Sequence, residues 1–214
     1  MKAMHTLSRA AAAAAMIAAT VSCGDVVRSS KAPVFLVIQK IGGVRGAATA
    51  AGTPAVPLIS DVITMVTTGG TCTTVNPCPT FFNDTAVATL SLSPKDIGPA
   101  GGAGVTPSSN NQVTITHVHV TYTRTDGKNT AGVDVPFDFD TGVTVTVPTT
   151  GTVDVAFEVV RNSAKLEEPL LSLRNNGIIV SMIANITFYG TDLVGNAISA
   201  TGTLQVDFGN FADQ

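Results

Sequence analysis

The region 178–208 carries the pattern that most restricts the fold of this chain. It contains two stretches in which apolar and polar side chains alternate strictly. The apolar positions are Ile178, Val180, Met182, Ala184, Ile186 and Phe188 in the first stretch, and Ile198, Ala200, Gly202, Leu204, Val206 and Phe208 in the second. A period of two sustained over both arms is typical of an antiparallel hairpin with one face on a core and the other in water. The segment 190–196 between them supplies Gly, Asp and Asn residues for the reversal.

Further strands are predicted along the rest of the chain. We expect them at 34–41, 58–66, 86–92, 113–123, 133–139, 143–147 and 153–159. The continuous apolar run at 34–41 predicts a strand buried on both faces. Segments 113–123 and 133–139 are predicted to pair across an Asp-Gly turn at 125–128. A switch in the parity of the apolar residues predicts a β-bulge near Thr116 and His117.

One segment, 162–177, has helical character. Glu167 and Glu168 precede Pro169, and Gly177 follows the apolar positions, which matches the preferences of a short helix at its two ends. The chain is 44% hydrophobic and 13% charged and has 20 Gly, a composition that favours many turns over a helical or disordered chain. We therefore predict an all-β fold: one immunoglobulin-like antiparallel β-sandwich over 33–214, with about eight or nine strands. The short crossover helix would close one end of it.

The first 22 residues have the features of a targeting segment. Lys2 and Arg9 give a positive beginning, and the apolar run at 10–20 is shorter than the roughly 20 residues of a membrane-spanning helix. The sequence Val21-Ser22-Cys23 then resembles the lipobox of bacterial lipoproteins. This resemblance implies that Cys23 is lipidated, that 23–32 is a tether, and that the protein is anchored in a bacterial cell envelope, on the periplasmic side or the cell surface. Thr20 stands where that pattern usually has Leu, so an ordinary secretory signal is the alternative.

Two further cysteines, Cys72 and Cys78, form an even and local pair. In an exported protein this pair predicts a disulfide. The bond would close a small loop, and it would staple a turn rather than hold the whole fold together, because disulfide stabilisation grows with loop length. Metal binding and catalytic redox chemistry are less favoured, because the spacing is not C-x-x-C and no second pair accompanies it.

The turn within the 178–208 hairpin also carries a resemblance. Residues 186–197, with Asp192, Gly195 and Asn196 at the reversal, are similar to the final hairpin of bacterial immunoglobulin-like domains. The order of elements along the chain resembles a group of uncharacterised bacterial lipoproteins with one such domain. These resemblances imply a fold and an envelope location and bring no activity with them.

The candidate metal site consists of His117, His119 and Asp138. The two histidines lie two residues apart on a predicted strand, and the expected hairpin places 136–138 opposite them. Asp134 and Asp138 would point toward the imidazoles. Two imidazoles and a carboxylate suit zinc or copper. The alternative is an exposed polar face on which His and Asp pair only weakly.

Other chemistry finds little support in the sequence. No G-x-S-x-G elbow and no phosphate-binding glycine motif is present, so no catalytic residue is predicted. The formal charge of −3 argues against nucleic acid as a partner. Two tyrosines, Tyr122 and Tyr189, are too few for an aromatic platform that stacks sugars.

We therefore expect an exported, lipid-anchored protein with a non-catalytic binding or structural role, and with an envelope protein or a polysaccharide as its partner. One alternative is a metal-binding protein or metal-dependent enzyme that uses His117, His119 and Asp138. Another is an accessory subunit of an envelope complex that uses a sheet edge or the loop 95–112. That loop is rich in Gly, Pro, Ser and Asn and is long for a connection, so it is either functional or simply mobile.

Overall fold

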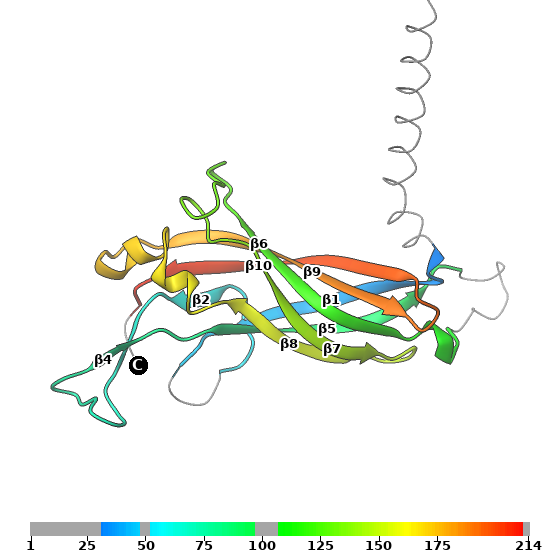
Figure 1. The fold of residues 1–214 in the computed structure, drawn as a ribbon, viewed down its shortest axis with the longest axis horizontal. Coiled ribbons are helices and arrows are strands. Elements are labelled where there is room, and N and C mark those ends of the chain that lie inside the picture. The colour runs from blue at the N-terminus through cyan, green and yellow to red at the C-terminus, as the bar shows by residue number, and fades with distance from the viewer. Residues whose placement is uncertain (1–30, 48–51, 97–106, 212–214) are drawn as a thin grey trace, which may run out of the picture.

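The computed structural model describes residues 31–47, 52–96 and 107–211, and these fold into two facing β-sheets and a small ribbon (Figure 1). The strands are β1 (Val34–Val44), β2 (Leu58–Asp61), β3 (Thr64–Val66), β4 (Cys78–Thr80), β5 (Asp84–Pro94), β6 (Val113–Thr123), β7 (Phe139–Val147), β8 (Val153–Val160), β9 (Val180–Asp192) and β10 (Ala197–Gly209). Short 3₁₀ helices are η1 (Ser109–Asn111), η2 (Ala164–Leu166) and η3 (Leu171–Asn175). The predicted all-β sandwich is confirmed.

The two sheets differ in size. One has three strands in the order β1-β5-β8, and the other has five in the order β2-β10-β9-β6-β7. All neighbours are antiparallel except β2, which runs parallel to β10. Strands β3 and β4 form the separate ribbon, which extends beyond the body of the sandwich in Figure 1. The more specific immunoglobulin-like assignment stays a prediction.

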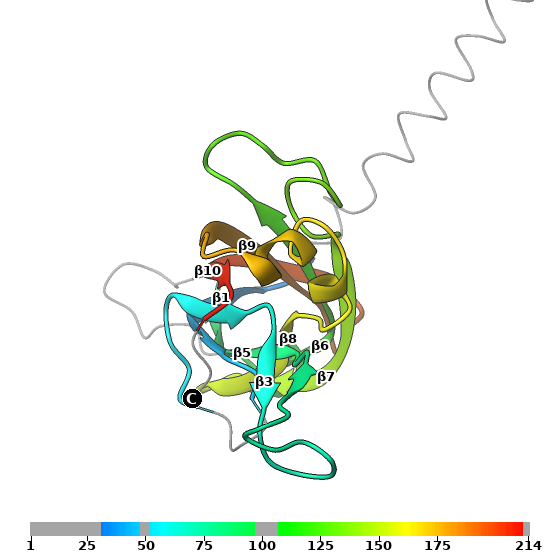
Figure 2. The ribbon, with the colours of Figure 1, turned by 90° about the vertical axis from the view of Figure 1, so that its left-hand side faces the viewer.

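The core lies between the sheets because each strand turns alternate side chains inward. Figure 2, which looks at the end of the molecule that carries η2 and η3, shows the strands arranged around a common interior. Phe157 of β8 meets Phe188 of β9 edge-on, with ring centroids 5.4 Å apart. The Tyr122 hydroxyl on β6 donates a hydrogen bond to the Val159 carbonyl on β8. This bond links the two sheets through the core.

The predicted hairpin is β9 and β10, and its inward face is as expected. Met182, Ile186 and Phe188 are fully buried, as are Leu204, Val206 and Phe208. Ile178 differs from the prediction, because it precedes β9 and is exposed. Gly190 also differs, because it belongs to β9 and not to the turn. A Cβ there would lie 2.4 Å from the Thr114 carbonyl oxygen, so Gly190 permits the close approach of β6.

Strands β1, β2 and β3 correct two predictions. Strand β1 is buried on one face only, since Phe35 and Val37 are exposed on the outer side of its sheet. The run 58–66 is two strands and not one. Its first part, β2, pairs with β10, and its second part, β3, pairs with β4 in the ribbon.

The predicted pairing of 133–139 with β6 is wrong, because only Phe139, the first residue of β7, lies opposite β6, and 133–138 forms a separate segment. Its residues fold locally, because the Thr130 carbonyl accepts hydrogen bonds from the backbone N–H groups of Val133, Asp134 and Val135. The partner of β6 is instead β7, so the connection between them is much longer than an Asp-Gly turn. The predicted bulge is confirmed, with a register shift between Ile115 and His117.

The crossover from β8 to β9 contains two 3₁₀ helices in place of the single predicted helix. Glu167, at the end of η2, has extended backbone angles, and Glu168 precedes Pro169, a position that disfavours helical geometry. Leu170 and Leu173 are nevertheless buried in the core. The segment therefore covers one end of the sandwich, as expected (Figure 1).

Several predicted segments lie wholly or partly outside the described residues. The targeting segment 1–22, Cys23 and most of the tether 23–32 are among them, as is 97–106 of the loop 95–112. Ala32 is already buried in the core, next to the predicted domain start. Within the described ranges, no helix is long and apolar enough to cross a membrane.

Candidate functional site

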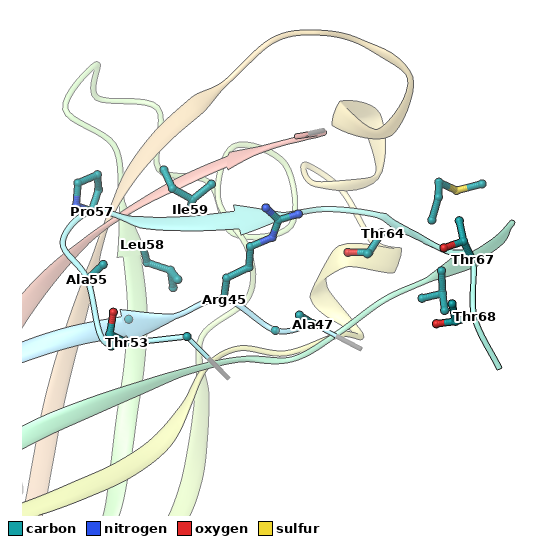
Figure 3. A pocket seen from close by; sticks show the side chains of 15 residues that line it. Arg45, Ala47, Thr53, Ala55, Pro57, Leu58, Ile59, Thr64, Thr67 and Thr68 are labelled. Carbon is teal, nitrogen blue, oxygen red and sulfur yellow. The ribbon is translucent and has the colours of Figure 1, made fainter. Parts of the chain in front are cut away.

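A cavity of about 380 Å³ lies where the chain leaves β1 and returns as β2 (Figure 3). Paired backbone hydrogen bonds of 2.8 Å between Gly43 and Ala55 hold the two sides of this return together. The lining residues are Gly43, Arg45, Gly46, Ala47, Gly52, Thr53, Ala55, Pro57, Leu58, Ile59, Thr64, Met65, Val66, Thr67 and Thr68. The volume is within the range typical of small-molecule sites.

Arg45 is the charged side chain among these lining residues. Its Nη2 lies 2.5 Å from the Oδ2 of Asp61, whose side chain is buried, while the Arg45 side chain keeps about 28% of its surface exposed. Figure 3 shows the guanidinium between Ile59 and Thr64. A guanidinium has five N–H donors, and this contact uses one side of the group. Asp61 therefore fixes the orientation of a cationic donor at the cavity.

A second buried carboxylate, Asp84, supports the same region from beneath. Its Oδ2 lies 2.8 Å from Lys165 Nζ and accepts a hydrogen bond of 2.6 Å from Ser60 Oγ. Its Oδ1 accepts a 2.7 Å hydrogen bond from the backbone N–H of Gly46, which lines the cavity. Asp84 and Lys165 are both essentially inaccessible to solvent. The Asp84 carboxylate thus connects β5 to η2 by the ion pair, and to β2 and the segment after β1 by hydrogen bonds.

The rest of the lining offers hydroxyl groups and apolar surface. Thr53, Thr64, Thr67 and Thr68 bring hydroxyls that can donate and accept, while Leu58 and Ile59 bring hydrocarbon. With Arg45, this set can orient a small polar molecule by hydrogen bonds and cover its apolar parts.

The predicted disulfide is present and lies next to this site. Cys72 and Cys78 are joined, with a Cα–Cα distance of 5.3 Å. Cys78 begins β4 and pairs with Val66 of β3, whose residues line the cavity. The bond therefore closes the ribbon that forms one wall.

Two of the predicted metal ligands, His117 and His119, lie on the outer face of the five-stranded sheet, and Asp138 directly precedes β7; none of the three lines the cavity. The His117 ring stacks on Tyr189 of β9, with centroids 4.7 Å apart and an interplanar angle of 7°. His119 Nδ1 lies 3.0 Å from Asp140 Oδ1, and its Nε2 lies 3.8 Å from Asp138 Oδ2. The structure therefore brings His119 to Asp138 and directs His117 elsewhere.

The reason is the register of β6 and β7. His119 lies opposite Asp140, and His117 lies opposite Gly142, so the predicted placement of 136–138 opposite both histidines is wrong. Asp134 accepts a hydrogen bond from the Thr130 N–H instead of facing the histidines. In the part of the chain that the structure describes, no group of three or more His, Cys, Asp or Glu residues is arranged to hold a metal ion. His117, His119 and Asp138 thus do not fit zinc or copper as a set.

The residues around the cavity were not identified from the sequence. Arg45 stands in a loop rich in small residues, and Lys165 stands in a segment predicted to be helical. The one available signal is Asp61, a carboxylate that ends an apolar strand. The sequence matches no protein-family model and none of the curated proteins with which it was compared. The function is therefore argued from the geometry.

Proposed function

We propose that this chain is an exported bacterial protein, anchored in the cell envelope by lipid on Cys23, whose β-sandwich binds a small polar ligand or the end of a larger one. The observation that carries the binding role is the cavity, in which the guanidinium of Arg45 is held by Asp61 beside threonine hydroxyls. We assign a binding role to this site because its lining supplies oriented hydrogen-bond donors beside apolar surface.

Two observations support export. The sequence Val21-Ser22-Cys23 follows a positively charged and then apolar segment, as in lipoprotein signals. The Cys72–Cys78 disulfide is a bond that persists in oxidising compartments and is rare in the cytosol. Several acyl chains on one cysteine would anchor the protein stably, whereas a single chain gives only marginal and reversible binding to a membrane.

The anchor is tested by the mass of the N-terminal peptide from membrane-fractionated protein, beside a Cys23→Ala variant. We expect an acylated Cys23 in the parent chain and release of the variant from membranes. An unmodified N-terminus on a protein that stays in the soluble fraction would contradict the anchor and leave a secreted sandwich.

The cavity is tested by saturation-transfer NMR with a library of polar fragments of about ten to fifteen heavy atoms. Ala55→Phe places a ring at the lining, and Val56→Phe is its control, because Val56 is the adjacent exposed residue and is not part of the lining. We expect fragments that bind the parent chain and the control to lose binding to Ala55→Phe. Equal binding to all three proteins would place the fragments elsewhere and remove the support for a cavity site.

A further inference from the structure

The outer face of the five-stranded sheet is rich in uncharged polar side chains. Strands β10, β9, β6 and β7 turn mainly Thr, Ser, Asn, Gln and His side chains outward. Several of these hydroxyls meet across strands: Thr187 and Thr201 at 2.9 Å, and Thr114 and Thr146 at 3.2 Å. The result is a broad surface of groups that both donate and accept hydrogen bonds.

An aromatic pair interrupts this polar surface. His117 and Tyr189 stand side by side on β6 and β9 with their rings parallel. Tyr189 covers the imidazole from the β9 side, and β7 is the neighbour of β6 on the opposite side, so we expect the second face of the imidazole to be turned toward β7. An uncovered ring face is a surface on which another ring can stack.

The residue of β7 opposite His117 is Gly142. A Cβ placed on Gly142 would meet no heavy atom within 4 Å, so the space above this glycine is open. Neighbouring strands are about 4.8 Å apart, which leaves room over Gly142 for one flat ring against the imidazole. Asp140 and Thr144, two residues away on either side, project from the same face of β7 and flank this space.

The charges of the face select among ligands. The four strands contain no Lys or Arg, and the acidic residues on the outer side are Asp140 and Asp207. Asp138 adds a third carboxylate near His119. On these four strands an anionic polymer would meet carboxylates and no Lys or Arg, whereas a carboxylate beside hydroxyls is a good acceptor for neutral O–H groups.

We infer that this face binds a neutral polysaccharide, one sugar ring of which lies over Gly142 and stacks on His117. The apolar C–H face of a pyranose packs on the imidazole, and its hydroxyls exchange hydrogen bonds with Asp140, Thr144 and the threonines of β6 and β9. His117, whose ring is stacked on Tyr189 of the neighbouring strand, thus supplies a stacking surface that the two tyrosines of the chain alone would not. Tyr122, the other tyrosine, is buried in the core. The site uses none of the residues that line the cavity and stands independently of the lipid anchor.

The test is isothermal titration of the full-length chain, kept in detergent, with neutral hexasaccharides of glucose, mannose, xylose and N-acetylglucosamine, and with hexagalacturonate as the acidic counterpart. We expect at least one neutral hexasaccharide to bind and hexagalacturonate not to bind. No binding of any neutral hexasaccharide at millimolar concentration overturns the inference, as does preferred binding of hexagalacturonate.

The position of the site is tested by a matched pair of glycine substitutions. Gly142→Val fills the space beside His117, and Gly177→Val is the control, because a Cβ at either glycine meets nothing within 4 Å and neither has a positive φ. We expect Gly142→Val to weaken binding at least tenfold with an unchanged thermal midpoint, and Gly177→Val to bind as the parent does. His117→Ala is expected to weaken binding similarly. Parent-like affinity of Gly142→Val would refute the placement.

Discussion

Replacement of Lys165 by Met is expected to destabilise the protein strongly. Lys165 and Asp84 are both fully buried, and their charged atoms are 2.8 Å apart. Met keeps most of the volume of Lys but removes the charge, so Asp84 would remain buried with only the Ser60 hydroxyl and the Gly46 N–H as partners. Removal of one member of a buried ion pair costs about 3–5 kcal/mol, because the remaining charge loses its compensation.

Urea unfolding followed by circular dichroism measures this loss directly. Thermal unfolding gives a second measure. For a domain of this size, 1 kcal/mol lowers the thermal midpoint by roughly 2–4 °C, so we expect the midpoint of Lys165→Met to fall by about 6–20 °C. The control is Lys128→Met, which changes an exposed lysine directly after the turn at 125–127. Its effect should stay within about 0.5 kcal/mol, as is usual for surface positions.

A second variant separates the ion pair from a general effect of packing. Asp84→Leu combined with Lys165→Met removes both charges, and replacement of a whole buried pair by apolar groups is often nearly neutral. We expect the double variant to recover part of the loss, although Ser60 and the Gly46 N–H lose their acceptor. A loss below about 1 kcal/mol in Lys165→Met, or a double variant less stable than either single one, would refute the reasoning.

Three further predictions follow from single contacts. Burial raises the pKa of Tyr122 well above its ordinary value near 10. Because the folded state favours the neutral phenol, the free energy of unfolding should fall above pH 10 by about 1.4 kcal/mol per pH unit. Urea unfolding at pH 9 and pH 11 should show this decline in the parent chain and not in Tyr122→Phe. The paired change Cys72→Ser and Cys78→Ser should lower stability by at most about 2.5 kcal/mol, given the short loop, with loss of hydrogen-exchange protection concentrated in β3 and β4; loss of protection throughout the sandwich would contradict this. Asp192→Ala should cost about 1–3 kcal/mol in urea unfolding, because the Asp192 carboxylate accepts three hydrogen bonds in the β9–β10 turn, two of them from Asn196; an unchanged stability would show that the turn does not need them.

The β9–β10 hairpin could be predicted because its information is local. Each residue of a strand faces opposite to the next, so an alternating sequence fixes which face is buried before any partner is known. The same logic located the bulge at Thr116 and His117, where the parity changes. It could not reveal that Gly190 belongs to the strand, since that role depends on the backbone of β6.

The pairing of β6 differs from the prediction because the Asp-Gly turn is only the first part of the connection to β7. Asp126 and Gly127 do form a turn, with the Gly127 φ at 81°. The chain then folds around the Thr130 carbonyl before it enters β7. Hydrogen bonds within a loop follow no regular period, so the apolar–polar pattern of the sequence does not show how many residues the loop contains. The shift moved Asp140, and not 136–138, opposite His119.

The residues that line the cavity and those that support it from beneath could not be predicted, for a different reason. Gly46 and Asp84 are 38 positions apart, and Ser60 and Asp84 are 24 apart. Each charged residue on its own is indistinguishable from a solvated surface residue, and only the fold shows which of them are buried and paired. Charge alternation and motif spacing are short-range signals and do not report such contacts.

The position of the buried charges suggests what they do. The core is apolar where the sheets face each other, and the Asp84–Lys165 pair stands at the end where the segment after β1 turns into the cavity wall. A buried ion pair is weak evidence for stability, because apolar residues of similar volume often serve as well. Its distinctive contribution here is to position the backbone beside the cavity, because Asp84 accepts a hydrogen bond from the N–H of Gly46, the residue next to Arg45. If the ion pair serves to position the segment with Gly46 and Arg45, the double variant Asp84→Leu and Lys165→Met should lose fragment binding at the cavity even at temperatures where it is fully folded. If the pair serves only stability, the folded double variant should bind as the parent does.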